Sequence, residues 1–559
     1  MKVRRRRRAG STKSSVRRHT PVKVSDTRGE GFDRRELLVR GGRLALGAGA
    51  LAAVPGWVAG GSRSTVDPRL VELAGLVQGT VVTSADAAYD SARRLYSPRF
   101  DDVRPGAIVF CNSAQDVWRT VRWSRRHSIR VVARSGGHSY AGYSTCRGVI
   151  VDVSRMNGVS VDHAAGTATI GAGALLIDVV QGLAQEGVAI PAGSCPTVGI
   201  AGLTLGGGHG FSGRAWGLTC DNVRSLKIVT AGGQLLLAST TQHPDLYWAC
   251  RGGGAGQFGI VTSFVFGTHA VSDVVTYRAT WSWSDAAKIV AAWQAWAPNA
   301  PDELFSMCDL IATDGPGGPI VASNGQYFGS ESGLQSLLQP LVSAATPQSM
   351  TIRTRSFLNA ALDWANCSDV ARCHIGVSGA EVGRSDFLAK SDYVATALPS
   401  AGIQTLIQRI EQRQNDPALG GGSVLMDAYG GAINRVPKGA TAFVHRDQLF
   451  SMQYVAGSST NADADWLRAF RAAMAPYVSG QAYQNYIDPE LAQPNVAYYG
   501  TNLPRLRTVS GSREACSPLQ PPELDPDQVG VGKQEAEREQ RQRRQPAAPD
   551  RGDRQRGSE

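Results

Sequence analysis

The sequence predicts an α+β protein with two domains, and three observations lead to this prediction. The chain has 559 residues, of which 42% are hydrophobic, so it can bury at least two cores. Between residues 87 and 266, short β-branched runs alternate with helical stretches and Gly-rich turns. Between residues 271 and 438, amphipathic helices such as 286–296 alternate with strands. The change of pattern near residue 270 predicts a boundary between two domains.

The first 64 residues have the pattern of a bacterial export signal. A twin-arginine pair, Arg34 and Arg35, precedes an apolar stretch at 44–54 and small residues at 59–61. The apolar stretch is too short to span a membrane as a stable helix. We therefore expect export by the twin-arginine route to the cell envelope or the extracellular space, without stable membrane insertion. The alternative is an arbitrary basic tail before an Ala-rich helix.

The net charge of +11 does not predict nucleic-acid binding. Much of the excess lies in the first forty residues, including the arginines at 4–8, and charged termini are usually solvated tails. The rest of the chain has no basic stripe interleaved with aromatic residues. The sequence also lacks H-E-x-x-H and paired C-x-x-C motifs, so we expect no metal site.

A Gly-rich turn follows the β-branched residues 131–132. Residues 135–139 read Ser-Gly-Gly-His-Ser, and such glycines let backbone N–H groups approach a bound anion such as a pyrophosphate. His138 brings an imidazole to the same ligand, where a neutral nitrogen can act as a nucleophile. Cys195 lies in a Gly/Pro loop and can do the same as a thiolate. Taken singly, a Gly-Gly turn with a histidine is usually only a turn, and a lone cysteine in a Gly/Pro loop is more often an inert packing residue.

A Rossmann dinucleotide site is disfavoured. Residues 254–259 satisfy G-x-G-x-x-G, but that fingerprint must open a helix and have an acidic residue about twenty positions later. Residues 260–266 instead have the β-branched and aromatic composition of a strand. We therefore expect a different kind of cofactor site.

The order and content of these segments resemble the berberine-bridge-enzyme-like oxidoreductases, within the vanillyl-alcohol-oxidase class of flavoproteins. Five ordered matches lie between about residues 95 and 507. They are the turn at 135–139, the Gly-Ser-Cys-Pro-Thr-Val-Gly loop at 193–199, the Gly-rich run at 202–210, the W-A-x-R-G-G-G and F-G-I-V segment at 245–262, and the C-terminal motifs at 483–488 and 498–502. The resemblance implies an FAD-binding domain at 87–270, then a substrate domain at 271–438 whose antiparallel sheet is covered by helices. It also implies a segment at 439–508 that returns to the FAD domain.

The resemblance further implies a flavin that is joined to two side chains. In the family, the motif His bonds to the flavin 8α-methyl group and the motif Cys to flavin C6, which assigns these roles to His138 and Cys195. The same motifs assign a wider set of FAD-binding residues. This set comprises Arg134, Ser135, Gly136, Gly137, His138, Ser139, Cys195, Val198, Gly199, Gly202, Gly206, Gly207, Gly208, Gly259, Ile260, Val261, Asn485 and Asn502.

The implied reaction is hydride transfer from a substrate carbon to flavin N5, which needs a base for the hydroxyl proton. By the Y-x-N-Y motif this base is Tyr486, and Tyr140 matches a second active-site tyrosine. A free tyrosine has a pKa of about 10, so the base role requires a lowered pKa. His445 and Asp488 are weaker candidates and stay outside the catalytic set. Val198 stands where the family's oxidases have a valine that lines the approach of O2, which favours an oxidase.

The expected partners are a small-molecule substrate and O2, and the expected product of O2 is hydrogen peroxide. The substrate is predicted to be an alcohol, either a sugar or oligosaccharide or a secondary metabolite. Two alternatives stay open: oxidative ring closure or dehydrogenation of an aromatic natural product, and a catalytically inactive flavoprotein. The sequence assigns neither the substrate nor the oligomeric state.

Two further expectations concern the cysteines and the C-terminus. Cys367 and Cys373 are the first pair to test for a disulfide, although buried free thiols fit equally well. After residue 507 the chain departs from the family pattern and continues as a Pro/Arg/Gln/Glu-rich segment at 509–559. We expect a disordered tail there, and a shift of reading frame after about Val509 is a hypothesis for its origin.

Overall fold

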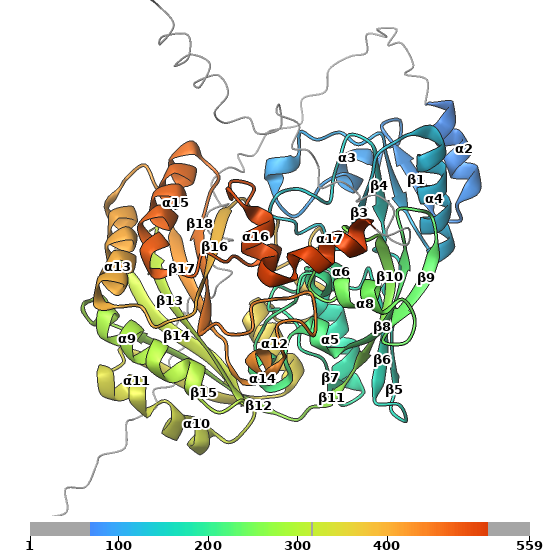
Figure 1. Ribbon diagram of the computed structural model, residues 1–559. Helices are drawn as coiled ribbons and strands as arrows, with labels where there is room; N and C mark the ends of the chain where they lie inside the picture. The colour runs from blue at the N-terminus through green and yellow to red at the C-terminus, as the bar shows by residue number, and fades with distance from the viewer. Residues whose placement is uncertain (1–66, 315–316, 512–559) are drawn as a thin grey trace, which may run out of the picture. The chain divides into compact units, whose positions relative to one another are not determined.

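The computed structural model describes residues 67–314 and 317–511 (Figure 1). The predicted export signal at 1–64 lies outside the described residues, as does the predicted tail beyond Gly511. Within these described ranges, no helix is long and apolar enough to cross a membrane.

A four-stranded sheet opens the described chain, in the order β1-β2-β4-β3. The helix α4 (Ala114–His127) connects β2 to β3, which lie parallel to β4 between them. Ser113 caps α4 by accepting a hydrogen bond from the Asp116 amide, and basic residues fill its last turn, where the helix dipole favours positive charge. The other elements here are α2 (Pro68–Leu76), β1 (Thr80–Thr83), α3 (Tyr89–Ala92), η1 (Pro98–Phe100), β2 (Ala107–Phe110), β3 (Val131–Arg134) and β4 (Val149–Asp152).

A five-stranded antiparallel sheet follows, in the order β5-β6-β10-β8-β9. Its strand β10 (Ile260–Gly267) begins directly after the G-x-G-x-x-G run, so no helix follows that run and the prediction against a Rossmann site is confirmed on this point. The remaining strands are β5 (Val159–Asp162), β6 (Thr167–Gly171), β8 (Val223–Val229) and β9 (Leu235–Ser239), and a separate pair joins β7 (Val188–Ala189) to β11 (His269–Ala270). The helical elements are α5 (Leu176–Gln185), α6 (Ile200–Leu205), α7 (Gly213–Trp216), η2 (Thr219–Asn222) and α8 (Pro244–Ala249).

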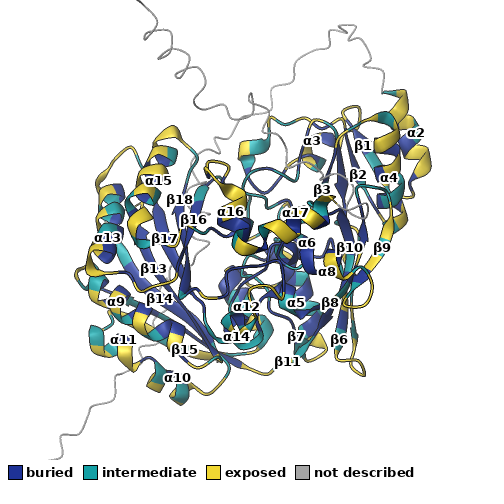
Figure 2. Cartoon of the chain, in the orientation of Figure 1, coloured by how far each residue is buried: buried dark blue, intermediate teal, exposed yellow. Residues whose placement is uncertain are grey.

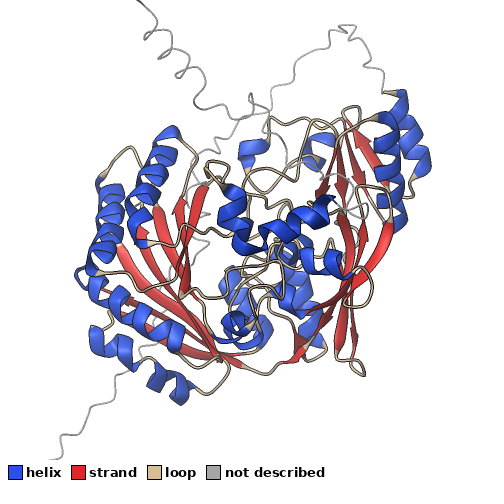
Figure 3. Cartoon of the chain, in the orientation of Figure 1, coloured by secondary structure: helices blue, strands red, loops and turns tan. Residues whose placement is uncertain are grey.

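A seven-stranded antiparallel sheet forms the second half, in the order β15-β12-β14-β13-β17-β18-β16. Its strands are β12 (Val274–Trp281), β13 (Leu304–Ala312), β14 (Ile320–Tyr327), β15 (Ser349–Arg355), β16 (Leu388–Val394), β17 (Gly422–Ala428) and β18 (Phe450–Ala456). Helices α9 (Ala286–Trp296), α13 (Ser400–Asn415) and α15 (Asn461–Met474) cover one face of the sheet (Figure 3). The predicted α+β class is confirmed, and α9 has the predicted bounds.

The two faces of this sheet have different roles, because side chains alternate along a strand. Val424 and Met426 on β17, like Met452 and Tyr454 on β18, belong to the apolar core under the helices. Their strand neighbours point the other way, toward the cavity described below. Figure 2 shows these strands as buried, with exposed residues on the outer surface of the helices. One face therefore stabilises the fold and the other builds a site.

The sheet extends beyond the predicted boundary at residue 438. Strand β18 lies between β17 and β16, and α15 packs on β16 and β18, so both belong with the seven-stranded sheet. Strand β1 likewise lies before the predicted start of the FAD domain at residue 87. The other helical elements of this half are η3 (Trp283–Asp285), η4 (Ala297–Asn299), α10 (Glu331–Leu337), α11 (Gln339–Ala344), α12 (Phe357–Ala365), η5 (Ala371–Cys373), α14 (Gly431–Arg435), η6 (Ala475–Tyr477), η7 (Gln484–Tyr486), α16 (Pro494–Tyr499), η8 (Gly500–Asn502) and α17 (Leu503–Gly511).

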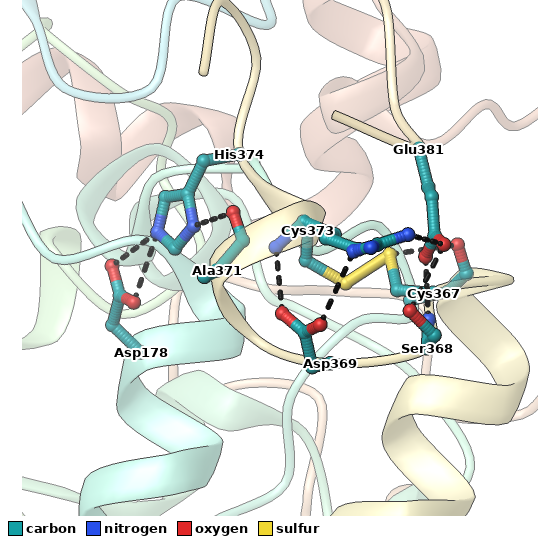
Figure 4. Close-up of a disulfide and its surroundings, with 10 residues drawn as sticks. Asp178, Cys367, Ser368, Asp369, Ala371, Cys373, His374 and Glu381 are labelled. Carbon is teal, nitrogen blue, oxygen red and sulfur yellow. Dashed lines mark hydrogen bonds and ion pairs between the residues drawn. A yellow bond between two sulfur atoms is a disulfide. The ribbon is translucent and has the colours of Figure 1, made fainter. Parts of the chain in front are cut away.

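Cys367 and Cys373 form a disulfide, as predicted, in the loop between α12 and β16 (Figure 4). Glu381 accepts hydrogen bonds from the backbone and hydroxyl of Ser368, at 2.5 and 2.9 Å. His374 lies beyond the disulfide, and its Nε2 is 3.0 Å from Asp178 Oδ1 on α5 (Figure 4). The loop is thus closed by a covalent bond and joined to α5 by an ion pair.

Replacement of both Cys367 and Cys373 by serine is expected to lower the free energy of unfolding by about 2 kcal/mol, because the disulfide restricts the unfolded chain over a short loop. Urea unfolding of the variant and the wild type measures this difference. Dithiothreitol should destabilise the wild type by the same amount and leave the variant unchanged. Equal stability of the wild type with and without the reductant would contradict the prediction.

Candidate active site

A cavity of about 320 Å³ opens beside the turn after β3, the start of α6 and the inner face of the seven-stranded sheet. Small-molecule sites usually measure roughly 300–1,000 Å³. The lining brings together segments that are hundreds of residues apart in the sequence. Of the predicted site residues, those that line it are Arg134, Ser135, Gly136, Gly137, His138, Ser139, Tyr140, Cys195, Val198, Gly199, Gly202, Gly259, Ile260, Val261, Asn485 and Tyr486.

Four predicted FAD-binding residues do not line this cavity: Gly206, Gly207, Gly208 and Asn502. The three glycines pack against protein atoms, since a Cβ there would meet Asn485, Phe443 or Thr219. Their small size lets the C-terminal segment approach, and the Gly208 amide donates to the Tyr483 hydroxyl at 2.9 Å. Asn502 donates to three backbone carbonyls at 438, 441 and 442, over 2.7 to 3.3 Å. These residues hold the segments that border the cavity.

The turn at 135–139 is shaped by two glycines. Gly137 has φ +69°, in the left-handed region that glycine adopts without strain. Gly136 lies so close to the backbone of Thr197 and Gly199 that a side chain there would collide with it. Ser135 Oγ donates to the Ala172 carbonyl at 2.7 Å. The turn is therefore packed directly against the loop that carries Cys195.

His138 is held in one orientation. Its ring stacks on Tyr96, with centroids 3.9 Å apart and planes 19° from parallel. Its Nε2 lies 2.9 Å from the hydroxyl of Thr197. Because Thr197 follows Cys195 by two residues, the same loop orients His138 and carries Cys195.

Cys195 differs from the other free cysteines in the part of the chain that the structure describes. It is half-buried and lines the cavity. The others are buried, and burial raises the pKa of each thiol, in the case of Cys250 to about 12. A thiol with a raised pKa forms little thiolate and reacts slowly. The remaining members of this inert group are Cys111, Cys146, Cys220 and Cys308.

Tyr486 and Tyr140 lie together in the cavity wall. Their rings are stacked, with centroids 5.5 Å apart and planes 17° from parallel. The Tyr140 hydroxyl accepts a hydrogen bond from Gln453 Nε2 at 3.0 Å. The Tyr486 hydroxyl lies 3.2 Å from Nε2 of His209. Each tyrosine hydroxyl therefore has its own polar partner within the wall.

A buried ion pair holds the segment that carries Tyr486. Lys390 Nζ on β16 contacts both carboxylate oxygens of Asp488 at 3.0 Å. Asp488 thus fixes the backbone two residues after Tyr486 and does not line the cavity. His445 does not line it either, and burial lowers the pKa of its imidazole to about 4. Neither residue belongs to the predicted catalytic set.

Several polar residues of the cavity lining were not predicted from the sequence, among them His209, Asp427 and Gln453. His209 Nδ1 lies 3.8 Å from Asp427 Oδ2, which places it between that carboxylate and Tyr486. His209 lies within the Gly-rich run at 202–210, and a titratable histidine inside such a run could have been named as a candidate site residue. Asp427 and Gln453 each interrupt an apolar strand, at Leu-Met-Asp-Ala and Ser-Met-Gln-Tyr, and that interruption is the signal that could have identified them.

The wall contributed by the substrate side is mainly apolar. Aromatic and aliphatic side chains from strands β13, β17 and β18, from helix α12 and from the loop before β16 line the cavity together with Asp427 and Gln453. They are Phe305, Met307, Trp364, Phe387, Leu425 and Val455.

Comparison with known proteins assigns the family. The model of an FAD binding domain matches residues 105–239. The uncharacterized FAD-linked oxidoreductase YgaK of Bacillus subtilis is 33% identical over 443 residues, which cover 77% of this chain and 93% of that protein. The berberine bridge enzyme-like D-1 of Nicotiana tabacum is 32% identical over 69% of this chain and 72% of that protein. The chain belongs to the berberine bridge enzyme-like FAD-linked oxidoreductases. A second family member, the xylooligosaccharide oxidase of Thermothelomyces thermophilus, is 30% identical over 72% of this chain and 84% of its own length.

The solved structure of BBE-like 1 from Physcomitrella patens has the same fold. It matches this chain with a TM-score of 0.73 and 32% identity, over 81% of this chain and 98% of its own. The protein is therefore an FAD-linked oxidoreductase with the two-domain fold of its family.

The residues around the cavity fit FAD. A Cβ at Gly202 or Gly256 would meet no protein atom within 4 Å, so a ligand can approach the backbone there. Arg134 is paired with Asp152 at 2.5 Å, yet its buried Nη1 has no hydrogen-bond partner in the described chain. A buried donor without a partner is costly, and an oxygen of a bound cofactor would satisfy it.

Proposed function

We propose that this protein oxidises an alcohol carbon of a small molecule, with FAD held covalently through His138 and Cys195 and with O2 as the final electron acceptor. One observation carries the proposal: His138, Cys195 and Tyr486 line the same cavity, although they come from distant parts of the sequence. FAD, when bound, accepts a hydride from the substrate carbon and passes two electrons to O2, which yields hydrogen peroxide.

In this proposal, Tyr486 removes the proton of the substrate hydroxyl. Tyr140 orients Tyr486 by stacking on its ring, and Gln453 holds Tyr140 in place by a hydrogen bond to its hydroxyl. Val198 lines the cavity three residues after Cys195, where a small side chain leaves room for O2. The apolar side chains of the cavity wall limit the number of water molecules around the reacting carbon.

Two substrate classes have support. The oxidase that acts on xylooligosaccharides is a relative at 30% identity, which supports a sugar or oligosaccharide. The mainly apolar wall instead supports the second candidate, an alcohol on an aromatic natural product, because such a surface stabilises a flat apolar body. We further propose export by the twin-arginine route, which is supported by the pattern around Arg34 and Arg35.

Anaerobic mixing with candidate alcohols tests the proposal. A substrate is expected to bleach the flavin absorbance without O2, and one equivalent of peroxide per turnover is expected when O2 is admitted. Xylooligosaccharides and cinnamyl-type alcohols represent the two classes. Bleaching without peroxide would indicate a dehydrogenase, and a flavin that no member of either class bleaches would favour the inactive flavoprotein.

A further inference from the structure

Behind Tyr486 lies a buried chain of polar groups from three different elements. Tyr486 is in η7, His209 follows the Gly-rich run after α6, and Asp427 lies on β17. The Tyr486 hydroxyl is 3.2 Å from His209 Nε2, and His209 Nδ1 is 3.8 Å from Asp427 Oδ2. The side chains of His209 and Asp427 are 5% and 1% exposed. All three residues line the cavity, and the side chains of His209 and Asp427 are shielded from bulk water.

The two ring nitrogens of His209 face different partners, and this selects the tautomer. A carboxylate beside Nδ1 favours the proton on that nitrogen. Nε2 then presents its lone pair, and the Tyr486 hydroxyl donates a hydrogen bond to it. A buried carboxylate is stable only when it is paired or hydrogen-bonded, and Asp427 also accepts a hydrogen bond from Ser451 at 3.4 Å.

We propose that His209 and Asp427 form a proton relay behind Tyr486, in which the imidazole holds the phenol proton while Tyr486 acts as a base. This inference rests on the proposed alcohol oxidation. Because His209 acts through Tyr486, it is a positioning residue. A neutral phenol must lose its own proton before it can accept another, and the imidazole of His209 accepts that proton.

Two protons change their bonding partners in this step. The substrate O–H bond breaks, and its proton forms a new O–H bond on Tyr486. The proton that Tyr486 carried before moves to His209 Nε2, which gives an imidazolium beside the Asp427 carboxylate. FAD, when bound, would take the hydride from the substrate carbon, and O2 would be the later oxidant. The substrate becomes a carbonyl compound.

Two tyrosines also pack against the ring of His209. Tyr483 and Tyr429 pack against its ring, with centroids 5.0 and 6.1 Å away. Burial raises the pKa of both hydroxyls well above the usual value, so neither competes for the proton near neutral pH. The carboxylate of Asp427 lies 3.8 Å from the imidazole, at Nδ1.

Three variants test the relay. His209→Gln keeps a hydrogen-bonding group beside Tyr486 but cannot take up a proton, and it is expected to slow flavin reduction about 10²-fold. In the wild type, kcat/KM should fall at low pH, where His209 is already protonated. Asp427→Asn removes the charge that favours imidazolium, so this acidic limb should move about 1 to 3 pH units lower. His269→Gln is the matched control, because His269 bonds to Asn222 at 2.7 Å outside the cavity.

A readout without turnover keeps the relay separate from the proposed reaction. In protein with ¹⁵N-labelled histidine, the His209 signal is assigned by its loss in His209→Gln. Asp427→Asn should lower the imidazole pKa, and Tyr486→Phe should shift its Nε2 resonance. Unchanged signals, or an acidic limb that stays in place in Asp427→Asn, would overturn the relay. Shifted signals in a protein that oxidises no alcohol would instead contradict the proposed function and support the His209–Asp427 coupling.

Discussion

A chain with both His138→Ala and Cys195→Ala is expected to release all its flavin on acid denaturation, whereas each single variant keeps it. The two residues line one cavity and come from two segments in direct contact, so either bond alone suffices to retain the cofactor. Intact mass and flavin absorbance of the denatured chain measure the outcome. The wild type should be heavier by the mass of one FAD.

Cys111→Ala is the control for this experiment. Cys111 is buried outside the cavity, and burial raises the pKa of its thiol, so its loss should leave the adduct intact. An adduct that persists in the double variant would place the attachment on other side chains. A yellow native protein that yields a bare polypeptide mass would show that FAD is bound without covalent bonds.

Tyr486→Phe is expected to slow flavin reduction by the substrate about 10²- to 10⁴-fold, the usual contribution of a positioned general base. The ring, its stacking on Tyr140 and the shape of the cavity are retained, so substrate binding should change little. The slower flavin reduction is therefore expected to come from the loss of proton removal alone. Anaerobic stopped-flow measurement of the reduction rate against substrate concentration separates the rate from the affinity.

Tyr89→Phe supplies the matched control, because Tyr89 is buried, does not line the cavity and donates to the Pro105 carbonyl at 2.6 Å. Its rate of flavin reduction should equal that of the wild type. A Tyr486→Phe variant that reduces its flavin at the wild-type rate would remove Tyr486 from the role of base. In that case Asp427 would be the next candidate, since it lines the same cavity.

Local patterns sufficed for several parts of this protein. Helix α9 and strand β10 lie where periodicity and β-branched residues predict them, because these signals act over neighbouring residues. The Cys367–Cys373 disulfide could also be predicted from the sequence, since the two cysteines are only six positions apart. Ordered motifs predicted the family and the turn and loop that line the cavity.

Only the tertiary structure decided which side chains meet. Asp427 and Gln453 reach the cavity because β17 and β18 are neighbours in one sheet and turn alternate residues to its inner face, and strand order is set by long-range pairing. The motif glycines at 206–208 do not line the cavity; they contact protein atoms instead, including those of the C-terminal segment that packs on them. The sequence by itself therefore determined the family, the cofactor class and most local elements. The packing of distant strands determined the cavity wall and the environment of Tyr486, because neither is encoded within a single segment.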